Sequence, residues 1–320
     1  LRGYPPLEVF LVAVSLAVAA VPEGLAAVVT ITLALGMREM IKRHALVRRL
    51  ASVENLGSTT VICSDKTGTL TQNRMAVSRV GIGPFVFEGS LEHRALLASS
   101  GVGDRHARNS ALHWLIANAA ANSTASLEQK HGKRVTVGNS TEGALLHWLE
   151  AGAWFRKGDG ISYLNLRAQY PVLHQTHFSS ERKRMTSVVG DAGRAVALVK
   201  GAPEVLLADC AAYLDADGVT RPLTAEARAE IQARITSAAA DAMRTLGFAH
   251  REMPADYPQD EEGIGARRDE IETGLVFDGW VGIRDPLRDD VKEAVHQCRA
   301  AGIEVKMITG DTIETARAIG

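Results

Sequence analysis

Hydrophobic positions dominate the first part of this sequence. Residues 9–37 contain one acid, one proline and no base, and a stretch of this length can cross the hydrocarbon core of a bilayer as a helix. Basic residues gather immediately after it, whereas Arg2 alone precedes it. Because cytoplasmic flanks carry such an excess of lysine and arginine, the pattern predicts a transmembrane helix over residues 8–41, with the following chain in the cytoplasm. The alternative is a buried core helix of a soluble protein.

A polar break interrupts the apolar stretch at Pro22, Glu23 and Gly24. The proline removes an intrahelical hydrogen bond and leaves carbonyls of the preceding turn without partners. An acid at membrane depth is costly, and beside unwound carbonyls it offers the oxygen ligands that suit a hard cation. We therefore expect a cation site here. The alternative is a proline kink with Glu23 hydrogen-bonded to a neighbouring helix.

Helical spacing of apolar and basic residues continues over residues 38–56 and ends at Gly57, which predicts a stalk. Apolar, β-branched residues at 59–63 then predict a buried strand of a parallel sheet. Directly after this strand comes the string Asp-Lys-Thr-Gly-Thr-Leu-Thr, at residues 65–71. The sequence thus places an acid and a glycine-containing turn where a strand ends.

Asp65 stands at the carboxyl edge of the predicted sheet, where open α/β sheets bind ligands. Gly68 and the flanking hydroxyls give a turn that can wrap a phosphate. A carboxylate that attacks phosphorus splits one difficult displacement into two easier ones, so we expect Asp65 to accept a phosphoryl group. A lone acid after a strand is more often a turn or capping residue.

Between residues 76 and 276 the pattern changes to short strands, helices and loops, which is enough chain for a domain of its own. Helical patterns cover residues 95–119, 143–151 and 225–245, a strand covers 195–199, and a polar surface loop covers 253–268. Pro203 suits the first turn of a helix. Asn139 or Ser140 suits the cap of the second helix, and Glu142 then either completes a capping box with Asn139 or contacts a ligand.

Strand and helix alternate again in the last part of the chain. A strand at 279–283 leads to Asp285 and Pro286, which predict the start of a helix that ends at Gly302. A second strand follows at 303–308, so the segment forms a β-α-β-α unit.

Thr309 falls at the end of this second strand, where its hydroxyl could bind a phosphoryl oxygen opposite Asp65. Asp311 follows shortly after and alternatively forms a capping box with Glu314. We weigh the phosphate-binding role above the cap.

Composition excludes several classes of protein. The formal net charge is −1 at pH 7, so the chain offers no basic field to nucleic acid. Cys63, Cys210 and Cys298 have no paired spacing, which indicates neither a disulfide framework nor a zinc site, and we expect reduced thiols. With 46% hydrophobic and 23% charged residues, 320 residues suffice for two domains with cores.

The string at residues 65–71 resembles the phosphorylation motif of the P-type cation-transporting ATPases, whose phosphorylation domain has a haloacid-dehalogenase-like fold. Thr-Gly-Asp at 309–311 is similar to that family's second phosphate-holding motif, and residues 18–25 are similar to the fourth transmembrane helix of its calcium-pump-like members. Ala26 departs from the second proline common in calcium pumps, and sodium/potassium pumps share the Pro-Glu-Gly-Leu string. The resemblance therefore only favours Ca²⁺ as the transported ion.

The resemblance implies an α/β protein in which a parallel, Rossmann-type phosphorylation domain is split by an inserted α+β nucleotide-binding domain. Its parts would be a transmembrane helix at 8–41, a stalk and the first part of the phosphorylation domain at 42–75, the nucleotide-binding domain at 76–276, and the second part of the phosphorylation domain at 277–320.

The resemblance also assigns roles to individual residues. The catalytic positions would be Asp65, Lys66, Thr67, Thr309, Gly310 and Asp311. ATP would be held by Glu142, Phe178, Arg182, Lys183, Lys200, Gly201 and Arg251, together with Thr67, Thr309, Gly310 and Asp311. Mg²⁺ would be held by Asp65 and Thr67, and the transported cation by Val18, Ala19, Val21 and Glu23. Without the resemblance, the charged residues at 178–184 would indicate a solvated surface turn, and Lys200 would indicate an exposed charge.

These assignments imply ATP-driven transport of a cation through an aspartyl-phosphate intermediate at Asp65. The bilayer, further membrane helices and an actuator domain would be the partners. The family's later lysine and Gly-Asp-Gly-x-Asn-Asp segment are not found in these 320 residues, so we expect the isolated chain to bind nucleotide but to turn over poorly. The alternatives are a soluble phosphatase of the same superfamily and an inert ATP-binding module. Thr67 argues against the phosphatase, which commonly has a second Asp at that position as general acid.

Overall fold

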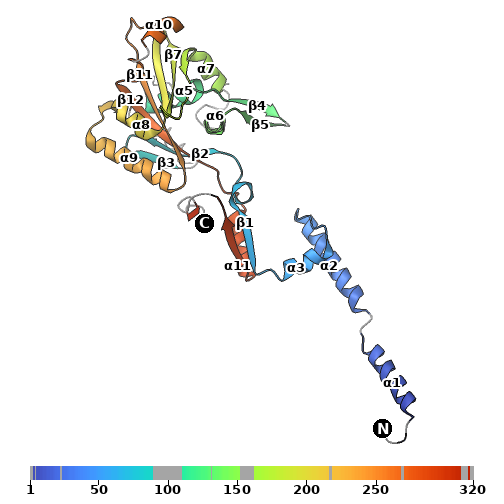
Figure 1. The fold of residues 1–320 in the computed structure, drawn as a ribbon. Coiled ribbons are helices and arrows are strands. Elements are labelled where there is room, and N and C mark those ends of the chain that lie inside the picture. Colours follow the sequence, from blue (N-terminus) through green and yellow to red (C-terminus); the bar gives the residue numbers. More distant parts are fainter. Residues whose placement is uncertain are drawn as a thin grey trace. The chain divides into compact units, whose positions relative to one another are not determined.

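The computed structural model describes residues 3, 5–21, 24–88, 110–130, 132–151, 162–215, 218–267, 270–310 and 316–317. Contacts divide the chain into two compact units. The first comprises Leu1–Cys63 and Glu293–Lys306, and the second comprises Ser64–Lys292 and Met307–Gly320. Figure 1 shows the elements of both units.

The first unit begins with helices α1 (Pro6–Ala19), α2 (Leu25–Lys42) and α3 (Leu50–Gly57). Strand β1 (Val61–Asp65) pairs with β13 (Glu304–Ile308), and helix α11 (Val291–Ala300) precedes β13. None of the residues of α1, α2, α3 and α11 is buried. Strands β1 and β13 confirm the strands predicted over residues 59–63 and 303–308.

The transmembrane helix expected over 8–41 is not confirmed. Among the described residues, no helix is both long enough and apolar enough to span a bilayer. The apolar stretch forms two helices of 14 and 18 residues. The shorter runs for about 21 Å at the usual rise, against a hydrocarbon core of about 30 Å. The longer carries Arg38, Glu39 and Lys42 toward its end.

Two further expectations for this unit need correction, and a third is not confirmed. The stalk is not one helix, because the chain leaves α2 after Lys42, adopts a left-handed backbone at His44 (φ 62°) and begins α3 at Leu50. Strand β1 is not buried, and Val61 is 44% exposed. The Rossmann-type parallel sheet is not confirmed, since within the described residues β1 and β13 form a sheet of two strands.

The second unit is built around a sheet that has nine strands within the described residues, in the order β10-β9-β12-β11-β8-β7-β6, with β2 and then β3 attached to β12. All its pairs are antiparallel except β9 with β12. The strands are β2 (Ala76–Ile82), β3 (Phe85–Glu88), β6 (Val172–Thr176), β7 (Arg184–Asp191), β8 (Arg194–Gly201), β9 (Cys210–Leu214), β10 (Thr220–Pro222), β11 (Arg244–Glu252) and β12 (Leu275–Arg284). A separate hairpin joins β4 (Ser126–Lys130) to β5 (Lys133–Val137). The boundary predicted at residues 276/277 falls inside β12.

Helices cover both faces of this sheet (Figure 1). Neighbouring residues of a strand point to opposite faces: Leu198 packs in the cluster of Trp114 and Leu145, whereas Val199 packs in the cluster of Ile231. The first cluster belongs to α5 (Ala111–Ala121), α6 (Ser140–Ala151) and α7 (Tyr163–Gln169), and the second to α8 (Pro203–Asp209) and α9 (Ala225–Ala240).

Buried asparagines fasten α5 to the sheet. Asn118 Nδ2 donates to the carbonyls of Val199 (3.0 Å) and Ala249 (3.1 Å). Asn122 Nδ2 donates to the Leu198 carbonyl (3.0 Å). Because a buried polar group is costly unless hydrogen-bonded, these contacts specify how α5 sits on strands β8 and β11.

Several element boundaries differ from the expectations. The helix predicted over 225–245 ends at Ala240, because the backbone turns left-handed at Ala242 (φ 58°) and Met243 N–H donates to the Ala238 carbonyl (3.1 Å). The loop predicted over 253–268 contains helix α10 (Glu261–Ala266), which Asp260 caps and whose Ile264 is buried. Within the helix predicted over 95–119, α5 begins at Ala111, and residues 95–109 lie outside the described part.

Candidate functional site

The loop that follows β1, residues 66–70, turns sharply at Gly68 (φ 79°). A side chain at such a φ would be strained, so glycine is the residue that suits this position. Glu304 N–H donates to the Thr60 carbonyl (2.8 Å) where β1 and β13 begin. Because the two paired strands start side by side, Asp65 and Thr309 both follow the same edge of this small sheet.

Thr71 fastens this loop to the segment after β12. The Thr71 side chain is fully buried, and its hydroxyl accepts from Gly68 N–H (3.1 Å) and donates to Asp285 Oδ2 (2.6 Å). Asp285 Oδ1 accepts from Arg74 N–H (3.1 Å). Arg288 donates from its side chain to the Gly68 carbonyl (2.9 Å). The loop beside Asp65 is therefore held in one shape by residues more than 200 positions away.

This use of Asp285 corrects an expectation. Asp285 was predicted to cap a helix that begins at Pro286, but its carboxylate is engaged by Thr71 and Arg74, and α11 begins at Val291. Pro286 instead accepts from Gln72 N–H through its carbonyl (2.9 Å). Residues 285–288 therefore pair with the loop rather than start a helix.

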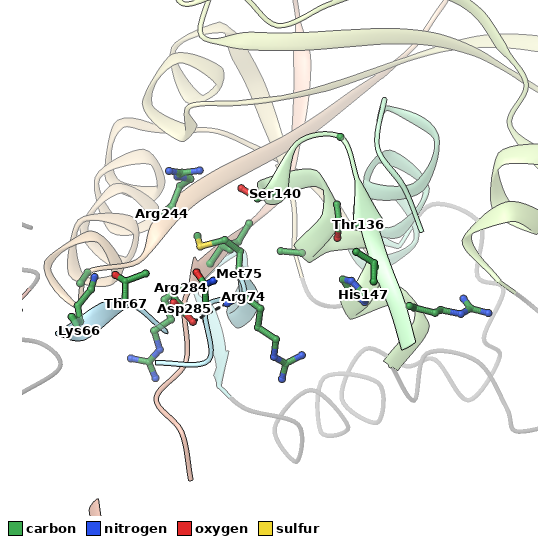
Figure 2. Close-up of a pocket in the computed structure, with 17 residues that line it drawn as sticks. Lys66, Thr67, Arg74, Met75, Thr136, Ser140, His147, Arg244, Arg284 and Asp285 are labelled. Atoms are coloured by element: carbon green, nitrogen blue, oxygen red, sulfur yellow. Dashed lines mark hydrogen bonds between the residues drawn. The ribbon is translucent and has the colours of Figure 1, made fainter. Parts of the chain in front are cut away.

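A pocket of about 790 Å³ opens beside this loop (Figure 2). Figure 2 shows Lys66 and Thr67 on one side and Thr136 and His147 on the other, with Arg74, Arg284 and Asp285 between them. Cationic side chains predominate among the charged lining residues, which are Lys66, Arg74, Arg134, Arg244, Arg284 and Asp285. The arrangement suits an anionic ligand.

Sequence reasoning missed most of this lining. Arg74, Arg134, His147, Arg244 and Arg284 come from the loop before β2, from β5, α6, β11 and β12. No motif or local spacing connects these positions in the sequence. The pairing of β12 with β2 and β11 brings the segments of Arg74, Arg244 and Arg284 together.

Two residues predicted to bind ATP are bonded to each other. Lys200 Nζ donates to Glu142 Oε1 (2.6 Å), and both side chains are buried. The other carboxylate oxygen of Glu142 accepts from Thr124 N–H (3.0 Å) and Ala125 N–H (3.1 Å). Burial opposes ionisation of Glu142, but the charge of Lys200 and the hydrogen bonds from Lys200 and Thr124 lower its pKa.

The capping box expected of Glu142 does not form. Asn139 caps α6, since its Oδ1 accepts from Thr141 N–H (2.8 Å) and Glu142 N–H (3.4 Å). The Glu142 carboxylate instead contacts Lys200 and the residues after α5. Lys200 is likewise not the exposed terminal charge that composition favours, because it is 5% exposed.

Phe178 lies 60% exposed in the segment between β6 and β7. Arg182, in the same segment, forms an ion pair with Glu272. Lys183 has a left-handed backbone (φ 52°), and its carbonyl accepts from Ala202 N–H (2.9 Å). A Cβ on Gly201 would overlap this carbonyl, so the glycine permits the close approach.

Arg251 is bound to the protein itself. Its guanidinium donates to the Glu270 carbonyl and to Thr273 Oγ1 (2.8 Å). The predicted ATP contacts at 142, 178, 182, 183, 200, 201 and 251 therefore do not line the pocket of Figure 2, whereas Thr67 does.

The predicted cation site is described only in part. Val18 and Ala19 end α1, and the Val18 carbonyl accepts from Val21 N–H (3.1 Å). Glu23 and Asp311 lie outside the described residues, as does Pro22, while Thr309 and Gly310 follow β13. Among the described residues, no group of three or more potential metal-ligating side chains gathers. Asp65 and Thr67 carry the oxygen atoms that suit Mg²⁺, and with a bound phosphate and water they would hold the ion beside the loop.

The architecture is a mainly antiparallel sheet with helices on both faces, preceded in the chain by the threonine- and glycine-containing Asp65 loop. A family model described as "P-type ATPase, cytoplasmic domain N" matches residues 111–290. The chain belongs to the P-type ATPases, and this part of it corresponds to their cytoplasmic domain N.

Individual relatives agree with this family. The chain is 40% identical over 318 residues to calcium-transporting ATPase PAT1 of Dictyostelium discoideum, covering 98% of this chain and 26% of the relative. It is 40% identical over 328 residues to cation-transporting ATPase pma1 of Synechocystis, covering 99% and 34%. It is 36% identical over 323 residues to a calcium-transporting ATPase of Bacillus subtilis, covering 100% and 35%. The chain thus spans 26% to 35% of the length of these relatives.

Proposed function

We propose that the protein transfers the terminal phosphoryl group of ATP to Asp65 and couples this step to transport of a cation across a membrane. The observation that carries the proposal is the Asp65 loop, in which Gly68 makes the turn and Thr71 holds it against Asp285. Two of the relatives above are named calcium-transporting, so Ca²⁺ is the first candidate for the ion.

In this reaction a carboxylate oxygen of Asp65 forms a bond to the γ-phosphorus, the bond from that phosphorus to the β,γ-bridging oxygen breaks, and ADP leaves. Asp65 is exposed at the end of β1, so its carboxylate is accessible to a nucleotide. Lys66 and Thr67 follow it directly and line the pocket. Cationic lining would offset the charge that accumulates on the transferring phosphoryl group.

Contact with the lipid bilayer is part of the proposal. Helices α1 and α2 have no buried residue, and Leu7, Phe10 and Leu16 are 68%, 63% and 66% exposed. Exposed apolar side chains in this number indicate a surface that another apolar phase covers. Further membrane helices and an actuator domain would complete the transporting protein.

The decisive experiment is labelling of the full-length protein with γ-labelled ATP and Mg²⁺ in the presence of candidate ions. We expect acid-stable label that hydroxylamine releases, absent in Asp65→Asn and retained in the control Asp256→Asn, whose side chain is 82% exposed. Metal-dependent hydrolysis of small phosphomonoesters without label would instead identify a phosphatase. ATP binding with neither activity would identify a nucleotide-binding module.

Transport is tested separately in reconstituted vesicles. ATP-dependent uptake of Ca²⁺ that Asp65→Asn and Glu23→Gln both abolish would support the coupling of the two sites. Label formation at Asp65 with uptake of another cation in place of Ca²⁺ would retain the mechanism and change the ion.

A further inference from the structure

The lining of the pocket in Figure 2 contains more cationic side chains than acidic ones. Among its described lining residues, Asp285 is the single carboxylate, and both of its oxygens already accept hydrogen bonds from Thr71 and Arg74 N–H. Arg134 has an outside partner, Glu150. The remaining arginines of the lining lack carboxylate partners among the described residues.

Arg284 is the most informative of these side chains. Its backbone pairs with β2, whereas its half-buried side chain makes no hydrogen bond or ion pair with any described residue. A guanidinium carries five donors and stays charged, so partial burial without a partner is unfavourable. Among the described residues, the Arg244 guanidinium donates to the neutral hydroxyl of Thr141 (2.6 Å), and Arg74 Nε donates to the neutral amide oxygen of Gln72 (2.8 Å).

The geometry points to a binding subsite for a small polyphosphate anion, formed by Arg74, Arg134, His147, Arg244 and Arg284. Arginine forks match phosphate oxygens in bidentate geometry. The volume of about 790 Å³ accommodates a chain of two or three phosphate groups with its water. The subsite goes beyond the proposed function, because it does not include Asp65 and shares no residue with the predicted ATP contacts at 142, 178, 182, 183, 200, 201 and 251.

His147 couples this subsite to protons. It faces Arg74 from the loop before β2, Arg134 from β5 and Glu150 from its own helix. Burial, and then the charges of Arg74 and Arg134, lower the pKa of His147, which Glu150 opposes. A bound polyanion would offset the two arginine charges, so the pKa of His147 would rise on binding and the complex would take up a proton.

The test is isothermal titration of the 320-residue chain with sodium tripolyphosphate at low salt. We expect the dissociation constant to rise by about tenfold or more in Arg74→Gln/Arg284→Gln, because charge-assisted hydrogen bonds are lost. The control Arg194→Gln removes an exposed arginine outside the pocket and should bind as the wild type does. Unchanged thermal melting verifies that the variants are folded.

Two sources of the anion are distinguished in the same titrations. Competition by ATP but not by adenosine assigns the subsite to nucleotide phosphates, and binding that ATP does not displace assigns it to a free polyphosphate; either supports the subsite. Titrations in buffers of different ionisation enthalpy should show proton uptake below the ordinary histidine pKa, reduced in His147→Gln.

Absence of tripolyphosphate binding at millimolar concentration would overturn the inference. So would binding that Arg74→Gln/Arg284→Gln leaves intact while Lys183→Gln weakens it, since the anion would then sit with the predicted ATP contacts. Phosphorylation is a separate readout: Asp65→Asn should lose the covalent label but keep tripolyphosphate binding, so failure of one proposal does not imply failure of the other.

Discussion

Lys200 Nζ lies 2.6 Å from Glu142 Oε1, and both side chains are buried between α6 and the end of β8. Burying two charges is costly, and their attraction offsets this cost only while both are present. The pair links the helix that contributes His147 to the strand whose Gly201 approaches Lys183. The pair therefore joins α6 to β8, two elements that carry residues predicted to bind ATP.

Removing one partner of this pair should destabilise the protein. We expect Lys200→Met to lower the free energy of unfolding at pH 7 by about 3–5 kcal/mol, because Glu142 would remain as an uncompensated buried charge. Since Lys200 and the hydrogen bonds lower the pKa of Glu142, this stabilisation is present above the ordinary glutamate pKa and is lost as pH falls through the lowered value. Urea unfolding at several pH values measures the loss of stability and its pH dependence. Lys200→Met/Glu142→Leu should cost less than Lys200→Met, and equal costs would contradict an electrostatic role.

A second buried pair predicts the opposite pH dependence. His250 Nδ1 lies 2.6 Å from Asp278 Oδ1, and the His250 ring stacks on Trp114 with centroids 4.5 Å apart. Asp278 Oδ2 is buried with no hydrogen-bond partner in the described part of the chain. Burial raises the pKa of Asp278 to about 6, although His250 opposes the rise.

A raised pKa means that the folded state holds a proton which the unfolded state releases. The contribution of Asp278 to stability is therefore complete below its ordinary pKa of 3.8 and is lost as pH rises through about 6. We expect this loss to be about 3 kcal/mol and to be absent in Asp278→Asn, as measured by urea unfolding between pH 4 and pH 7.5. Asp256→Asn, at an exposed position, should retain the wild-type profile. Parallel profiles for all three proteins would argue against titration of Asp278.

The hydroxyl of Thr71 should control the shape of the Asp65 loop. In Thr71→Val, which keeps the side-chain volume, Gly68 N–H and Asp285 Oδ2 lose their partner. We expect a loss of about 1–3 kcal/mol in stability, since an unsatisfied buried group costs this much, and faster amide exchange at Gly68. Thr69→Val changes an exposed threonine of the same loop and serves as the control. If both variants exchanged equally, the contact with Asp285 would not hold the loop.

Gly143 should not tolerate a methyl group. It lies in α6 against Thr136 of β5, and a Cβ at this position would overlap the Thr136 side chain. Gly143→Ala should therefore lower the free energy of unfolding by about 1–3 kcal/mol through overpacking, and with it the melting temperature, although alanine favours helices. Gly265→Ala in α10 meets nothing within 4 Å, so there the helix preference of alanine should stabilise the protein by up to about 1 kcal/mol. A melt of Gly143→Ala at or above the wild type would refute this packing.

Local patterns predicted those elements whose signals are contained within one segment. The strand before Asp65, the strand ending at Gly201, the helix opened by Pro203 and the cap of α6 by Asn139 are all present. The strands were predicted from runs of β-branched residues. The helix start and the cap were predicted from the fixed backbone angle of proline and the capping geometry of asparagine. Errors occurred where a distant segment competes for the same residue, as when Thr71 engages Asp285 and prevents it from capping a helix.

The sequence by itself placed the acid, the turn glycine and the threonines next to one another near Asp65, and this string predicted the family that the comparisons confirm. The tertiary structure alone decided the partners: Glu142 neutralises Lys200, Asp285 holds Thr71, and four arginines from four separate segments line one pocket. Lys200, Arg244 and Arg284 lie on antiparallel strands, so a shift of one residue in register would turn these side chains to the other face.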